Sequence, residues 1–108
     1  MNSNSEVTFT PLTSGSTGRG NIQLSQPFTN FSEIVILGAN DGATYVTPTI
    51  FNTKMLDYCL DELNNPVLLP CGRSSYYVIK PYSGGSSTTL FVQNEENAMV
   101  IAIYGITY

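Results

Sequence analysis

Short runs of β-prone residues, each ended by Gly, Pro, Asn or Asp, recur along most of this chain. The clearest run is SYYVIK at residues 75–80, because aromatic and β-branched side chains favour strands. Asn and Asp tolerate a positive φ and Gly adopts it freely, which suits tight connections between strands. Strands at this spacing indicate an all-β fold, either a β-sandwich or jelly-roll-like fold or a barrel. We expect strands at residues 21–25, 33–37, 43–49, 67–69, 75–80, 88–93 and 98–104.

The C-terminal part of the chain has the pattern of a hairpin, with strands at 88–93 and 98–104 and a turn between them. The second strand is apolar on both faces and continues almost to the last residue, whereas chain ends usually fray. A strand that is apolar on both faces needs two covers. In a domain of this size, the second cover can be another chain. We therefore predict an oligomer interface at Met99, Ile101, Ile103 and Tyr104.

One segment, TKMLDYCLDEL at residues 53–63, departs from the strand pattern. Its apolar residues repeat at helical spacing, although alternation fits part of the segment as well. Its length and its good helix formers favour a short helix. The first helical row is Met55, Tyr58, Cys59 and Glu62, and the second is Leu56, Leu60 and Leu63.

The chain of 108 residues has the length of one domain. Residues 1–19 are rich in Ser, Thr, Gly and Asn, and such a composition is typical of a flexible stalk or linker. The alternating stretch at residues 6–10 can add an edge strand to this segment. We assign the β-sandwich domain to residues 20–108.

The charge of the chain excludes two classes of partner. Only 11% of the residues are charged, and the net charge is −4. Nucleic-acid binding needs clustered cations, as does an anionic membrane surface. The chain has only four scattered basic residues, so we expect neither partner. The basic residues are Arg19, Lys54, Arg73 and Lys80.

Two further features bear on the compartment. No apolar run approaches the ~20 residues that cross a bilayer, and the N-terminus lacks the pattern of a secretory signal. We therefore expect synthesis in a cytoplasm, unless the chain is a fragment of something larger. A disulfide between Cys59 and Cys71 is possible, but reduced thiols are expected in a chain without an export signal.

The chain has no histidine, which removes the commonest general base and the commonest metal ligand. Two cysteines alone do not make an ordinary zinc site, and no Gly-rich loop has the lysine of a phosphate-binding loop. The carboxylates at Asp57, Asp61 and Glu62 fit a solvated helix face, and Glu95 and Glu96 fit a charged turn. We therefore expect no enzyme activity, no cofactor and no metal.

The seven tyrosines are the feature that most favours binding. A tyrosine ring can pack with one side and form a hydrogen bond with its hydroxyl. In SYYVIK, Tyr76 and Tyr77 point to opposite faces of the strand, so one is in the core and the other is exposed. Cross-strand packing explains any single tyrosine as well. The predicted ligand residues are Arg73, Tyr77 and Tyr82, with Asn40 and Asp41 in a second loop.

Four short motifs carry a resemblance to a known family. They are G-x-I-x-L-S at Gly20–Ser25, N-F-x-x-I-V-I at Asn30–Ile36, V-T-P at Val46–Pro48 and I-Y-G-I at Ile103–Ile106. Together they resemble the small β-rich C-terminal modules of tail fibres and tailspikes of tailed bacteriophages. The resemblance covers residues 20–108, except for the helix-like segment at residues 53–63.

The resemblance implies a homotrimeric virion part at the distal end of a fibre. Such a part attaches to a host cell-surface polysaccharide or an outer-membrane receptor, or it acts as a structural cap that holds the trimer together. It also implies that Phe28 and Phe31 anchor the loop between two strands, either in the core or at the trimer axis. An enzyme domain and an unrelated cytoplasmic β-domain remain as further alternatives.

Overall fold

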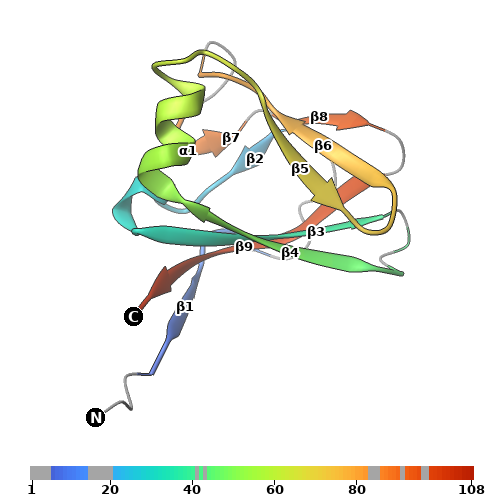
Figure 1. Cartoon of the computed structure of the whole chain (residues 1–108). Coiled ribbons are helices and arrows are strands. Elements are labelled where there is room, and N and C mark those ends of the chain that lie inside the picture. Colours follow the sequence, from blue (N-terminus) through green and yellow to red (C-terminus); the bar gives the residue numbers. More distant parts are fainter. Residues whose placement is uncertain are drawn as a thin grey trace.

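The computed structural model of the chain describes residues 6–14, 21–40, 42, 44–82, 86–90, 92–95 and 98–108. Two antiparallel sheets face each other, with a short helix along one side (Figure 1). The first sheet has the order β1-β9-β3-β4, the second has the order β5-β6-β8, and β2 pairs with β7. The predictions of an all-β fold and of a short helix are confirmed. The strands are β1 (Thr8–Pro11), β2 (Ile22–Gln23), β3 (Glu33–Asn40), β4 (Val46–Asn52), β5 (Val67–Cys71), β6 (Ser75–Ile79), β7 (Thr89–Leu90), β8 (Val92–Glu95) and β9 (Ala98–Thr107), and the helices are the 3₁₀ turn η1 (Phe28–Asn30) and α1 (Thr53–Leu60).

The core lies between the two sheets. β3 and β9 are the central strands of the first sheet, and Ile36 of β3 pairs with Ile103 of β9. Side chains alternate between the two faces of a strand, and paired residues share a face, so Ile36 and Ile103 both point into the core. Their partners across the core come from β5 and β6. The core cluster is Leu12, Ile22, Leu24, Phe28, Ile34, Ile36, Leu56, Leu60, Leu69, Cys71, Tyr77, Ile79, Leu90, Ala98, Val100 and Ile103.

The loop before β3 is anchored by its two aromatic residues. Phe28 is fully buried, and Phe31 packs against the core cluster. The backbone N–H of Phe31 donates to the carbonyl of Phe28 at 3.2 Å, which closes the 3₁₀ turn. Of the two positions that the resemblance implied for these rings, the core is the one they occupy.

Helix α1 begins and ends with local signals. The Asn52 side chain accepts a hydrogen bond from the backbone N–H of Met55 at 2.9 Å, as expected of an N-cap. At the other end, Asp61 is the C-cap, and its N–H donates to the carbonyl of Asp57 at 2.8 Å. Of the second predicted row, Leu56 and Leu60 are buried, whereas Leu63 lies beyond the helix and is exposed. Met55, in the first row, is exposed as well.

The prediction of a C-terminal hairpin between the segments 88–93 and 98–104 is wrong, because the described strands of these segments do not pair with each other. The segment 88–93 divides into β7, which pairs with β2, and β8, which pairs with β6. β9 lies instead between β1 and β3 in the first sheet. A strand that is apolar on both faces is favoured at the centre of a sheet, where another layer covers one of its faces. Because β9 occupies such a central position, its partners are β1 and β3.

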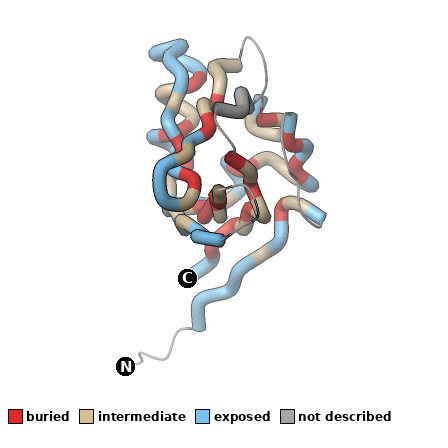
Figure 2. Tube along the Cα trace, turned by 90° about the vertical axis from the view of Figure 1, so that its right-hand side faces the viewer, coloured by how far each residue is buried: buried red, intermediate tan, exposed pale blue. Residues whose placement is uncertain are grey.

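The N-terminal segment belongs to the packed domain as far as the structure describes it. β1 is an edge strand paired with the end of β9, as the alternation at residues 6–10 predicted. Leu12 is fully buried and its N–H donates to the carbonyl of Ile103 at 2.8 Å. Residues 8–14 are therefore not a flexible stalk, and the domain boundary at residue 20 is too late; residues 15–19 lie outside the described residues. Figure 2 shows β1 as an exposed strand that leaves the buried interior.

Both cysteines are free thiols, as expected. Cys71 is buried in the core, while Cys59 is half-buried on α1. The two side chains therefore have different access to solvent.

Candidate functional site

The outer face of the four-stranded sheet is apolar. Cross-strand partners share a face of the sheet, and Ile34 and Ile36 turn inward, so Val35 and Leu37 turn outward with their partners. We call the outward positions in this register the outer sheet face. Row by row, they are Phe9, Ile106, Glu33 and Asn52; Pro11, Tyr104, Val35 and Ile50; Ala102, Leu37 and Pro48; and Met99, Ala39 and Val46.

Burial supports this division into two faces. Val35, Ala39 and Ile106 are buried but do not belong to the core cluster. At the two edges of this face, Phe9 on β1 and Ile50 on β4 leave 55% and 59% of their surface in solvent. The outer sheet face is therefore a second apolar surface, and its edges are open to solvent.

Charge is almost absent from the outer sheet face. Among its described positions, Glu33 is the only charged side chain. The Tyr108 hydroxyl donates a hydrogen bond to Glu33, and this bond raises the pKa of Tyr108 above its ordinary value. The pair lies at the rim, where β3 begins and β9 ends. The middle of the face is free of charge.

Of the four predicted interface residues, the structure places two, Met99 and Tyr104, on the outer sheet face. Met99, Ile101 and Tyr104 are half-buried, and Met99 and Tyr104 pair with outward positions of β3. Ile101 lies where the register between β3 and β9 shifts. Ile103 is fully buried in the core, so its prediction as an interface residue is wrong. Sequence alone does not show the register shift, which changes the inward parity along β9.

Two turns lie side by side at one end of the sandwich, and we call this region the loop end (Figure 1). It consists of the β3–β4 turn and the β5–β6 turn. The Asn40 side chain accepts a hydrogen bond from the backbone N–H of Tyr45 at 2.8 Å. The N–H of Gly72 donates to the Thr47 hydroxyl at 2.8 Å, and this hydroxyl donates to the carbonyl of Gly72 at 3.2 Å.

Gly72 makes this close approach possible. Its φ is +72°, and a Cβ at this position would lie 2.6 Å from the backbone nitrogen of Asn40. Both facts require glycine. Arg73 follows it and is exposed, so the structure brings the predicted residues Asn40 and Arg73 to the same end of the molecule. Asp41 lies outside the described residues.

The other two predicted ligand residues are elsewhere. Tyr77 is fully buried in the core, so its prediction as a ligand residue is wrong; Tyr76 is the exposed member of the pair. The Tyr82 hydroxyl donates to the Asp57 carboxylate at 2.5 Å, and the Tyr82 N–H donates to the carbonyl of Leu60 at 3.2 Å. Tyr82 therefore holds its segment against α1 and does not join the loop end.

Tyr45 is an exposed aromatic residue beside the loop end that sequence reasoning did not name as a candidate. It is 51% exposed and lies directly after the β3–β4 turn. The signal for it was an aromatic residue next to a Gly-containing turn, GATY at residues 42–45. A strand assigned too early, at residue 43, placed this tyrosine inside the sheet.

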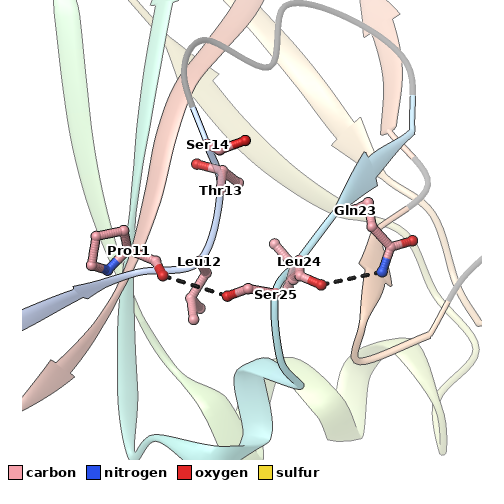
Figure 3. Close-up of a pocket in the computed structure, with 7 residues that line it drawn as sticks. All are labelled: Pro11, Leu12, Thr13, Ser14, Gln23, Leu24 and Ser25. Carbon is pink, nitrogen blue, oxygen red and sulfur yellow. Dashed lines mark hydrogen bonds between the residues drawn. The ribbon is translucent and has the colours of Figure 1, made fainter.

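A cavity of about 310 Å³ lies between the segment after β1 and strand β2, and Figure 3 shows its lining. Its polar groups are used within the chain. The Ser25 hydroxyl donates to the carbonyl of Pro11 at 3.5 Å, the Gln23 amide donates to the carbonyl of Leu24 at 3.1 Å, and the Thr13 hydroxyl accepts from the N–H of Ile103 at 3.2 Å. The hydrogen bonds around this cavity therefore hold the N-terminal segment against the domain.

A second cavity, of about 460 Å³, is polar and lies at the start of α1. Its lining includes Asn52, which caps the helix, and Thr53, whose hydroxyl donates to the carbonyl of Phe31. Asn30 also lines it and donates to the Gln26 side chain at 3.0 Å. These groups serve the local fold. The full lining is Thr29, Asn30, Phe31, Ser32, Asn52, Thr53 and Lys54.

The third cavity is an apolar groove of about 280 Å³ between β4, α1 and β5. Met55, at 61% exposure, stands on one side of it, and Cys59 lies one helical turn further on. Ile50 belongs to both this groove and the outer sheet face. The apolar surface therefore continues from the sheet onto the helix. The groove is lined by Ile50, Phe51, Asn52, Met55, Leu56, Cys59 and Val67.

The titratable groups with shifted pKa values do not line these cavities. Burial raises the pKa of the Cys71 thiol. Burial and the hydrogen bond to Asp57 raise the pKa of Tyr82. Among the described residues, no group of three or more His, Cys, Asp or Glu side chains lies in an arrangement that holds a metal ion. The candidate binding features of the described surface are therefore the apolar outer sheet face and the apolar groove beside it.

Comparison of the chain with protein-family models, with curated proteins and with solved structures finds no match. In the described part of the chain, no helix is long and apolar enough to cross a membrane.

Proposed function

We propose that this chain is a self-assembling β-sandwich module of a bacteriophage tail fibre or tailspike, and that its outer sheet face packs against copies of itself. The observation that carries the proposal is the apolar outer sheet face, whose edge side chains Phe9 and Ile50 leave more than half of their surface in solvent. The fibre context rests on the motif resemblance, in which a terminal apolar strand closes a homotrimeric virion part.

The size of the outer sheet face suits this role. Four strands at a spacing of roughly 4.8 Å, with about seven residues of roughly 3.3 Å each, give a footprint of roughly 400 Å². The largest apolar patch on a typical monomer is roughly 300–600 Å² and is often functional, so this face has the size of such a patch. At about 25 cal/mol per Å², burying this footprint stabilises each chain by at most about 10 kcal/mol. That gain is of the same order as the cost of association, about 4–15 kcal/mol.

The distribution of charge favours the outer sheet face over the rest of the surface as a contact between copies of the chain. Copies with a net charge of −4 repel each other, so they associate only where the contact area excludes most of this charge. The outer sheet face does so, because its one described carboxylate, Glu33, lies at the rim and accepts a hydrogen bond from Tyr108.

The test is the molar mass in solution, measured by light scattering. We expect a trimer of about 35 kDa, three times the 11.8 kDa of one chain. Ile50→Glu places a charge on the outer sheet face and should give a folded monomer. Leu68→Glu is the matched control, because Leu68 is 60% exposed, almost the same as Ile50, but lies on the other sheet. A monomeric wild type, or equal masses for the two variants, contradicts the proposal.

A second candidate function is attachment to a host surface polysaccharide through the loop end. The supporting observation is that the exposed Tyr45 and Arg73 lie beside the Asn40 turn. An aromatic ring can stack on the face of a sugar, while amide and guanidinium groups bond its hydroxyls. An outer-membrane receptor is an alternative target for the same loops.

Glycan-array binding tests this second function. Tyr45→Ala should lose retention of the bound glycan without a change in melting temperature. Tyr58→Ala is the control, because Tyr58 is 49% exposed but lies on α1. Equal retention for the two variants removes Tyr45 from the site.

A further inference from the structure

A ring of three identical chains needs two different patches that fit each other, since each copy contacts the next in a head-to-tail manner. The first sheet provides two such patches at its opposite edges, β1 and β4. The roughly 400 Å² footprint of the outer sheet face is about half of the ~800 Å² per partner in a stable interface. The edges therefore have to contribute to the contact.

One edge carries projecting apolar side chains. β1 runs past the body of the sandwich in two perpendicular views (Figure 1 and Figure 2). Phe9 projects from it on the outer side, and Val7, two residues earlier, is also exposed. A strand that pairs on one side only is a ready contact for another chain. This edge is the projecting patch.

The other edge carries a hollow. The apolar groove lies beside β4, and Ile50 joins it to the outer sheet face. A cavity of about 150 Å³ suffices for a benzene ring, so the groove of about 280 Å³ has room for a phenylalanine side chain. Met55, an adaptable side chain, stands exposed at its border. This edge is the receiving patch.

We propose that β1 of one copy docks at the apolar groove of the next copy, with Phe9 inserted between β4 and α1. This inference rests on the proposed self-assembly and specifies its contact. The charges beside the two patches are complementary. Glu6 precedes the projecting side chains, and Lys54 lies in the first turn of α1, next to Met55. Both Glu6 and Lys54 are exposed.

Cys59 in the groove allows a direct test by disulfide crosslinking. Phe9→Cys, oxidised with copper phenanthroline, should give a covalent ladder of two and three chains on a non-reducing gel. Val7→Cys keeps Phe9 in place and serves as the second variant, in case Phe9 is needed for assembly. Thr8→Cys is the matched control, because adjacent strand residues point to opposite faces. Cys71 does not interfere, since it is fully buried.

The outcomes separate this inference from the proposed function. A ladder that reaches three chains with either test variant, and that is lost when Cys59→Ser is added, supports the docking. A trimeric mass by light scattering without such a ladder overturns the docking alone. A ladder that stops at two chains, or that persists without Cys59, also overturns it. A monomeric wild type overturns the docking and the self-assembly together.

Discussion

Gly105 on β9 provides a quantitative test of the packing that positions the outer sheet face. A Cβ at this position would lie 2.5 Å from Cγ of Phe31 and 2.6 Å from its Cδ1 and Cδ2. The ring cannot easily move away, because the backbone of Phe31 is held by hydrogen bonds to Phe28 and Thr53. We therefore expect Gly105→Ala to destabilise the fold.

The expected cost follows from two opposing effects. Extra volume in a packed site costs roughly 1–3 kcal/mol. Replacing Gly by Ala within a strand returns roughly 0.5–1 kcal/mol of backbone entropy. The net loss in the free energy of unfolding is about 1–2 kcal/mol. For a domain of this size, that corresponds to a fall in melting temperature of roughly 5–10 °C.

Chemical denaturation at a fixed protein concentration measures this loss, because self-association makes stability depend on concentration. Phe31→Ala removes Cγ, Cδ1 and Cδ2, the ring atoms that the new methyl group meets. The double variant should therefore lose about 1 kcal/mol less stability than the sum of the losses in the two single variants. This difference is larger than the ~0.3–0.5 kcal/mol within which independent effects add. Additive effects, or a Gly105→Ala variant as stable as the wild type, refute the reasoning.

Three further predictions test local features of the fold. Because the pKa of Tyr82 is raised above the ordinary ~10, Tyr82 keeps its proton in the folded state when the unfolded chain has lost it. The free energy of unfolding should therefore fall as pH rises above about 10. Tyr82→Phe should reduce this fall and should cost about 1–2 kcal/mol at pH 7, because the hydrogen bond to Asp57 is lost. Urea titrations at several pH values measure both effects, and the same dependence of stability on pH in the wild type and the variant would argue against the bond. Since burial raises the pKa of Cys71, a thiol reagent at pH 8 should leave Cys71 unlabelled until denaturant is added, and mass spectrometry of labelled peptides shows whether it does. Gly72→Ala should cost about 1–3 kcal/mol, since φ is +72° and Asn40 is too close; melting curves check this, and an unchanged melting temperature would contradict the turn geometry.

Much of the fold was predictable because its signals are local. The strands at 33–37 and 75–80 appear where β-prone runs occur, although β3 continues to Asn40. Helix α1 forms in the segment with helical spacing, and Asn52 caps its first turn. The pairing of strands was less predictable. The run at 88–93 contributes to two sheets, and only contacts with distant strands decide such a division.

The candidate site was predictable only in part. Arg73 and Asn40 were identified as residue types suited to binding, and the structure brings them to one end through Gly72. Tyr77 was assigned to the wrong face, because alternation says that Tyr76 and Tyr77 diverge but not which of them is buried. Ile103 was misplaced for a related reason, since a register shift reverses the inward parity along β9.

The sequence by itself determined the all-β class, the site of the helix and the apolar character of the last strand, because these depend on propensities and periods within a few neighbouring residues. Only the tertiary structure decided which face of each strand is the core. It thereby showed that Val35, Tyr104, Ile106 and their partners form a second apolar surface. Side-chain alternation fixes the relative orientation of neighbours along one strand, whereas the choice between inside and outside depends on what packs across the sheet, and that is decided by residues far away in the chain.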